Sequence, residues 1–248
     1  MNITFLKKAL AVSREGKAAA LATNLKTGEQ ALIQEFESTG NLPVTDVLMN
    51  AVRLAWQRDE NSDVMTGNGK IFIEIFNPRL RMIIVGAVHI AQPLARMASL
   101  TGYLVTIVDP RSAFGSTDRF PDVELSNEWP DDAMKKLKPD RRTAVVTLTH
   151  DPKLDDPALI EALKSEAFYI GALGSRKTHA RRFERLKETG VTEATFARIK
   201  GPVGLKIGAI SPAEIAISVM AEVTQVLRAP VEERKAERAA EKAREAAA

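Results

Sequence analysis

Short apolar strands that alternate with helices constrain the fold of this chain more than any other feature. Because parallel strands need long crossover connections, and because a sheet built this way is covered on both faces, such strands are apolar throughout. This pattern predicts an α/β fold, a doubly wound Rossmann-like parallel sheet with its ligand crevice at the carboxyl ends of the strands. The expected strands are residues 81–86, 103–109, 144–148 and 168–172, and the expected helices include 90–100, 157–165 and 213–228.

The chain divides into three zones. Residues 1–79 are expected to form a smaller N-terminal α/β domain, which ends near Pro78 because the residue before a proline is disfavoured in helical geometry. Residues 80–229 hold the Rossmann-like dinucleotide-binding domain, and residues 230–248 are a charged, alanine-rich tail that favours an exposed helix. Within the first zone the expected strands are 17–23, 31–36 and 70–76, and the expected helix is 46–56.

Composition excludes several classes of protein. The chain has no cysteine, which excludes disulfides, thiolate metal sites and a persulfide carried by the protein itself. Its formal net charge of +3 over 248 residues does not indicate a nucleic-acid-coating surface. No apolar run approaches the roughly 20 residues of a membrane span, and the first residues do not resemble a signal peptide. We therefore expect a cytoplasmic protein with no membrane span, no nucleic-acid partner and no metal site.

The first turn with a chemical signature follows the strand that ends at Gly86. A helix begins directly after His89, and Asp109 follows at about the 20-residue distance at which the dinucleotide fold places an acidic residue for a ribose hydroxyl. Gly86, Ala87, Val88 and His89 are therefore candidates for phosphate binding at a helix N-terminus. Val88 stands where a second glycine normally lets a pyrophosphate approach, so its side chain should push the phosphates away or shift their path. The alternative is a strand–turn–helix unit without a ligand.

The second candidate is the segment Asp109, Pro110 and Arg111. The aspartate can accept a hydrogen bond from a ribose hydroxyl, while the arginine can bind an adjacent phosphate. In the alternative interpretation, Asp109 and Arg111 pair with each other or cap a turn. The position at a strand end favours phosphate binding.

The third candidate is the segment Thr149, His150 and Asp151, which a strand delivers to the same rim. Histidine and aspartate together are suited to general acid–base chemistry or to holding a metal. Because the sequence offers no partner nucleophile, a binding role is favoured over a catalytic one.

The fourth candidate is a glycine-serine turn before a basic helix. Gly171 and Gly174 end a strand, and Ser175 begins a helix that also carries Arg176. Backbone N–H groups at such a helix start, with a guanidinium group nearby, favour an anion. The alternative is a solvated basic helix face.

Two helix starts are predicted from local patterns. Asp156 is expected to be the N-cap of a helix that starts at Pro157. Ser211 and Glu214, with Pro212 between them, form the pattern of a capping box.

Several runs in this part of the chain resemble the XdhC/CoxI family, over about residues 79–227. They are, in order, GAVHIAQPLARMASLTGYLVTIVDPR, TAVVTLTHDPKLDD, YIGALGSRKTHARR, PVGLKIGA and SPAEIA. The resemblance implies an accessory maturation factor for molybdenum-containing hydroxylases such as xanthine and carbon monoxide dehydrogenases. Such a factor binds the molybdenum cofactor, protects it during sulfuration by a partner cysteine desulfurase, and delivers it to an apo-enzyme.

The chain departs from the family pattern in two places. Residues 1–79 lack the cysteine-containing, glycine-rich segment of full-length members, and Val88 and Lys206 replace a usual glycine and aspartate. The first departure leaves a dinucleotide site for FAD, NAD(P) or molybdopterin cytosine dinucleotide. The leading hypothesis is therefore a non-catalytic maturation factor. The alternatives are an FAD- or NAD(P)-dependent oxidoreductase, with His150 as its candidate acid, and a docking scaffold without a ligand; a homodimer is left open.

Overall fold

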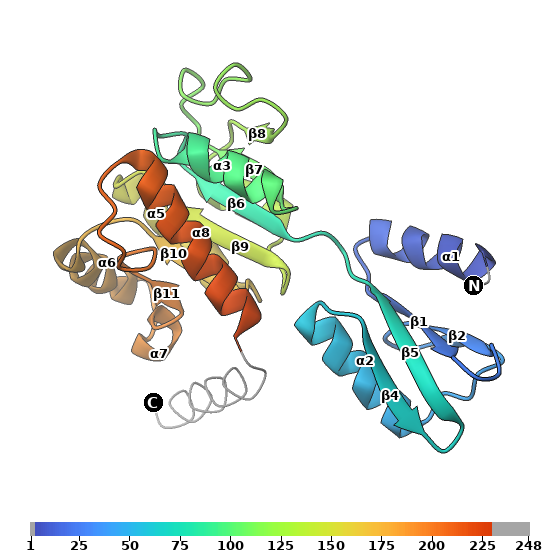
Figure 1. Ribbon diagram of the computed structural model, residues 1–248. Helices are drawn as coiled ribbons and strands as arrows, with labels where there is room; N and C mark the ends of the chain where they lie inside the picture. Colours follow the sequence, from blue (N-terminus) through green and yellow to red (C-terminus); the bar gives the residue numbers. More distant parts are fainter. Residues whose placement is uncertain (1–2, 230–248) are drawn as a thin grey trace. The chain divides into compact units, whose positions relative to one another are not determined.

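The computed structural model describes residues 3–229, which fall into two compact units with their boundary between Arg79 and Leu80 (Figure 1). The predicted C-terminal tail, residues 230–248, lies outside the described residues. No described helix is both long and apolar enough to cross a membrane.

The first unit is an antiparallel five-stranded sheet in the order β3-β2-β1-β5-β4. Side chains alternate between its faces, so Ala20 contributes to the core under helix α2, whereas Ala19 contributes to a smaller cluster with helix α1. The strands and the helix predicted here are present, while α1, β3 and β4 were not predicted. The elements are α1 (Ile3–Arg14), β1 (Ala19–Asn24), β2 (Gln30–Ile33), β3 (Ser38–Gly40), α2 (Asp46–Arg58), β4 (Ser62–Thr66) and β5 (Gly69–Phe76).

The second unit contains a parallel six-stranded sheet in the order β11-β10-β9-β6-β7-β8. Counted along the chain this is the 3-2-1-4-5-6 order of the Rossmann fold, so the predicted doubly wound sheet is confirmed. The strand order reverses between β6 and β9, where Val85 pairs with Val108 on one side and with Thr147 on the other. The strands are β6 (Arg81–Val85), β7 (Leu104–Val108), β8 (Glu124–Ser126), β9 (Thr143–Thr147), β10 (Tyr169–Ala172) and β11 (Ile199–Lys200).

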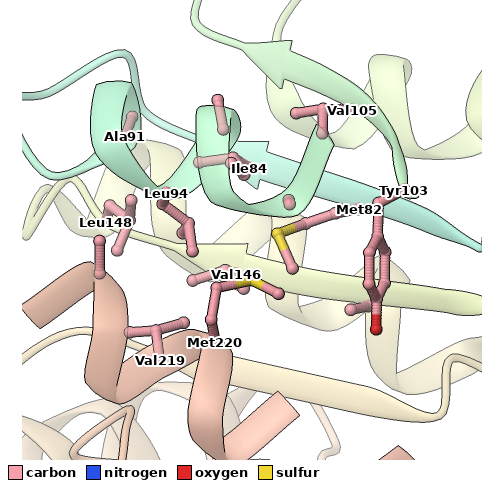
Figure 2. Packing of buried hydrophobic residues seen from close by; sticks show 14 of the residues in the cluster. Met82, Ile84, Ala91, Leu94, Tyr103, Val105, Val146, Leu148, Val219 and Met220 are labelled. Atoms are coloured by element: carbon pink, nitrogen blue, oxygen red, sulfur yellow. The ribbon is translucent and has the colours of Figure 1, made fainter. Parts of the chain in front are cut away.

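Both faces of this sheet are buried, which explains why its central strands are apolar throughout. Met82 and Ile84 of β6 pack on the face covered by α3 and α8, which lie side by side (Figures 1 and 2). Ile83 and Val85 pack on the opposite face with residues of α4, α5, α6 and α7. The helices are α3 (Ala91–Leu100), α4 (Pro130–Leu137), α5 (Pro152–Lys164), α6 (Arg176–Glu188), α7 (Glu193–Phe196) and α8 (Pro212–Arg228).

The start of α5 differs from the prediction. Asp151 is the N-cap and accepts a hydrogen bond from Lys153 N at 2.9 Å, whereas Pro157 lies inside the helix. The prediction that Asp156 caps a helix beginning at Pro157 is therefore wrong. Asp156 instead accepts two hydrogen bonds from Arg185 of α6, and this tertiary contact holds a helical turn that the local pattern disfavours.

The capping box of α8 is confirmed. Ser211 Oγ accepts a hydrogen bond from Glu214 N at 3.3 Å, and Glu214 Oε2 accepts one from Ser211 N at 2.8 Å. Each bond satisfies a backbone N–H that the helix cannot satisfy itself.

Replacing Ser211→Ala should lower the free energy of unfolding by about 1 kcal/mol, because the cap is lost and the Glu214 N–H remains without its acceptor. Equilibrium urea unfolding followed by circular dichroism measures the change. The exposed Ser112→Ala is the control and should change stability by less than about 0.5 kcal/mol. Equal effects of the two substitutions would contradict the structural role of the cap.

Candidate nucleotide-binding site

The predicted site residues lie in four turns that follow the carboxyl ends of β6, β7, β9 and β10. Because these strands are neighbours in one parallel sheet, the turns meet at the same edge, and the strand order reverses between β6 and β9. The structure therefore brings together residues 86–89, 109–111, 149–151 and 174–176. Gly171 is the exception, since it lies inside β10.

Gly86 and Thr149 join the turns after β6 and β9. Gly86 has a φ of 105°, and a Cβ atom added to it would lie 2.4 Å from Thr149 Cγ2. Only glycine combines this backbone geometry with so close an approach. The first glycine of the turn is therefore required by packing within the protein, at the point where the strand order reverses.

Val88 and His89 complete the turn after β6. Val88 is partly buried and packs against the core under α3 and α8, while His89 is exposed. The N-cap of α3, Ile90, makes no side-chain capping bond. The side chain at the second-glycine position thus contributes to the core.

Asp109 is fully engaged by its own chain. Its Oδ2 accepts hydrogen bonds from Ala87 N and Arg111 Nη2, both at 2.8 Å. Its Oδ1 accepts from Arg111 N at 3.0 Å and from Arg111 Nε at 2.8 Å. Asp109 and Arg111 thus pair with each other across Pro110, one of the two arrangements considered from the sequence. A ribose hydroxyl would have to displace one of these donors.

This pair presents a cation at the rim. The Asp109 side chain is fully buried, whereas that of Arg111 is 39% exposed and lies over the Phe114 ring at 4.6 Å. Burial alone would raise the pKa of Asp109, but hydrogen bonds from Arg111 and Ala87 and the guanidinium charge together lower it. The same hydrogen bond raises the pKa of Arg111.

The β9–α5 turn is internally bonded. Thr149 Oγ1 accepts from Asp151 N at 3.0 Å, and the Asp151 carboxylate caps α5. His150 is exposed, with a φ of 63°, and its side chain makes no hydrogen bond to the residues that the structure describes. The turn thus has a defined backbone but does not fix the proton of His150.

The β10–α6 turn combines packing and capping. A Cβ atom on Gly171 would lie 2.6 Å from Val203 Cγ2, so this buried glycine has a packing role. Gly174 has a φ of 142°, and Ser175 is the N-cap that accepts from Thr178 N at 3.1 Å. Arg176, directly after the cap, is exposed.

Two buried residues at this edge were missed by the sequence analysis. Asp155 Oδ1 accepts a hydrogen bond from Thr149 Oγ1 at 2.7 Å, and Asp155 Oδ2 lies 3.5 Å from Arg182 Nη2. Arg182 Nη2 also donates to Leu173 O at 3.0 Å, and both charged side chains are almost fully buried. Arg182 lies four residues before the buried Leu186 on α6, and a charge at an otherwise buried helix position is the signal that could have identified it.

These features define the class: a Rossmann-fold domain whose ligand edge has two aspartate–arginine pairs, one at the rim and one buried. A family model described as the XdhC Rossmann domain matches residues 82–223. The chain belongs to the XdhC family.

Known relatives agree with this assignment. Over 214 residues the chain is 30% identical to a Bacillus subtilis protein named as a probable xanthine dehydrogenase component, covering 85% of this chain and 61% of that protein. It is 33% identical over 151 residues to the molybdenum cofactor insertion chaperone PaoD of Escherichia coli, covering 61% of this chain and 41% of that one. A crystal structure described as a xanthine dehydrogenase from Bacillus halodurans has a TM-score of 0.69 and 28% identity, over 91% of this chain and 64% of that one. The chain thus spans less than two thirds of each of these proteins.

The contact between the two turns gives a first test. Gly102→Ala introduces only a left-handed backbone, since nothing lies within 4 Å of the new Cβ atom, and should cost about 1–2 kcal/mol. Gly86→Ala adds the overlap with Thr149 and should cost about 1–3 kcal/mol more. Urea unfolding of both variants decides, and equal losses would contradict the close approach of Gly86 to Thr149.

The Asp109 pair predicts a pH dependence. Because the pKa of Asp109 is lowered in the folded protein, its contribution to stability is present above the ordinary aspartate value near 3.8 and is lost as the pH falls through the folded value. Asp109→Asn should lower the free energy of unfolding by roughly 1–3 kcal/mol at pH 7, and the difference from wild type should shrink below about pH 4. The exposed Asp118→Asn is the control, and a difference for Asp109→Asn that does not change with pH would refute the prediction.

Proposed function

We propose that this chain is an accessory maturation factor for a molybdenum-containing hydroxylase of the xanthine or carbon monoxide dehydrogenase type. In this proposal it binds a nucleotide-containing cofactor at the carboxyl edge of the parallel sheet, protects it, and inserts it into the apo-enzyme. The observation that carries the proposal is the similarity of the Rossmann unit to the chaperone PaoD, whose name states molybdenum cofactor insertion. The relative from Bacillus subtilis, whose name refers to xanthine dehydrogenase, supports the same class of partner.

The residues at the edge fit the diphosphate of such a cofactor better than they fit its ribose. Asp109 already accepts four hydrogen bonds, so a free carboxylate for a ribose diol is missing. Arg111 uses Nε and Nη2 for this pair and keeps Nη1 for an oxyanion, and Arg176 adds a second exposed cation. Molybdopterin cytosine dinucleotide, FAD and NAD(P) all contain a diphosphate, and this shared group is what we propose the rim binds.

The oxidoreductase alternative gains no support from the site. A general acid or base needs a partner that fixes its proton within hydrogen-bond reach of the substrate. His150 is exposed and has no such partner among residues 3–229. We therefore propose a binding role for the β9–α5 turn.

Equilibrium binding tests the proposal. Titration of the purified chain with FAD, NAD, NADP and molybdopterin cytosine dinucleotide should show micromolar or tighter binding of at least one of them. Arg111→Gln should weaken that binding about tenfold, because one charge-assisted hydrogen bond to a phosphate is lost. Arg141→Gln is the matched control, since Arg141 pairs with Glu166 just before β9, at the opposite edge of the sheet.

Absence of tight binding to every one of these dinucleotides would contradict cofactor binding. Equal weakening by Arg111→Gln and Arg141→Gln would show that the binding does not occur at the carboxyl edge. Delivery is tested separately: a cofactor-free molybdenum hydroxylase should gain activity when it is incubated with the loaded chain and should gain none with the unloaded chain.

A further inference from the structure

Arg182 is a buried cation with unused hydrogen-bond donors. Its side chain is 2% exposed, yet Nε and Nη1 have no hydrogen-bond partner among the described residues. Nε has one N–H and Nη1 has two, so three of the five guanidinium donors are unsatisfied. Buried polar groups are satisfied in the great majority of cases, and a charged group left this way normally has a partner that comes from outside the chain.

The guanidinium group lies just below the carboxyl edge of the sheet. Nη2 donates to Leu173 O, directly after β10, and contacts Asp155, which is bonded to Thr149 after β9. Arg182 is therefore between the β9–α5 and β10–α6 turns, the two turns that the sequence analysis assigned to cofactor binding. Thr147 Oγ1 is also buried without a partner in the described part of the chain. It points to the face on which α5 and α6 pack, since it alternates with Val145 along β9 as that face requires.

The charge of Arg182 is only partly compensated by Asp155. The two side chains share a single contact of 3.5 Å, and burial lowers the pKa of Arg182 and raises that of Asp155. The neighbouring pair on the same two helices is different. Arg185 donates to both oxygens of Asp156, at 2.6 and 3.0 Å, in a half-exposed position. The Arg185 pair is complete, whereas Arg182 keeps donors for another acceptor.

We propose that Arg182 is the inner binding residue of the cofactor site and takes an oxyanion of the phosphate class between the β9–α5 and β10–α6 turns. This inference rests on the proposed function, because it names a contact of that same site. Thr149 and Asp155 regulate access in this arrangement. The Asp155 carboxylate, held by Thr149, competes with the incoming oxyanion for the guanidinium group and keeps the empty site neutral.

Inorganic phosphate is the probe that tests this subsite. Thermal unfolding of the full chain is followed while phosphate replaces sodium chloride at constant ionic strength, so that only specific binding raises the midpoint. The wild type and Arg185→Gln should show the same rise in midpoint with phosphate. Arg182→Gln should bind phosphate about tenfold more weakly, and Arg182→Lys, which keeps the charge, should fall between the two.

Asp155→Asn makes the test independent of any loss of stability. The amide has the shape of the carboxylate and still accepts a hydrogen bond from Thr149, but it removes the competing charge. We expect Asp155→Asn to bind phosphate several-fold more tightly than the wild type, whereas Asp156→Asn, the matched control, should not change the affinity. A purely structural role of the buried pair predicts no gain. A phosphate response that is unchanged in both Asp155→Asn and the Arg182 variants overturns the proposal, and so does a wild type that does not respond to phosphate.

The same variants separate this inference from the proposed function. If the wild type binds a dinucleotide but Arg182→Lys and Asp155→Asn bind it with unchanged affinity, the inner subsite is wrong and the maturation-factor proposal survives. If phosphate binding follows Arg182 and Asp155 as expected but no dinucleotide binds, the subsite survives and the proposed cofactor is wrong.

Discussion

The contact between Gly86 and Thr149 is the constraint on which the ligand edge depends. It joins the turns after β6 and β9 at the position where the strand order reverses, and open α/β sheets bind their ligands at this position. The glycine is needed because a side chain would overlap Thr149 in a backbone conformation that other residues rarely adopt. The distance between the two turns, and so the width of the crevice floor, is fixed by this packing before any ligand arrives.

Two aspartate–arginine pairs lie on either side of this contact, and they differ in what they leave free. The Asp109–Arg111 pair exposes part of its cation and buries its carboxylate, which suits a phosphate at the rim. The Asp155–Arg182 pair is buried on both sides and retains unused donors. Because each pair is neutral as a whole, the edge can contain several charges without a large cost of self-repulsion. A cofactor with more than one anionic group would find a cation at each level of the edge.

The sequence predicted most of the Rossmann sheet because its signal is local. The run 81–86 is apolar throughout since both faces of β6 are covered, and the caps at Ser175 and Ser211 follow from residues within three positions of each other. Strands β8 and β11 were missed because two or three residues are too few to show a pattern. The tertiary contacts of Asp156 with Arg185 also overrode a local prediction.

The candidate site could be predicted only as a set of turns. Their positions follow from strand ends, but the partners of the charged residues do not. Asp155 and Arg182 are separated by 27 positions, and only the packing of α5 against α6 brings them together. Asp109 had two plausible roles in the sequence, and the structure shows its pairing with Arg111 because that contact depends on side-chain geometry.

Hydrogen–deuterium exchange tests the central claim most directly, namely that the carboxyl edge of the parallel sheet binds a diphosphate-containing cofactor. Amide exchange would be compared with and without a saturating dinucleotide, by mass spectrometry of peptides that cover the described residues. The account predicts slower exchange in the turns 86–91, 149–152 and 174–178, with little change in the first unit. Slower exchange confined to residues outside these turns, or no change at saturating ligand, would contradict it.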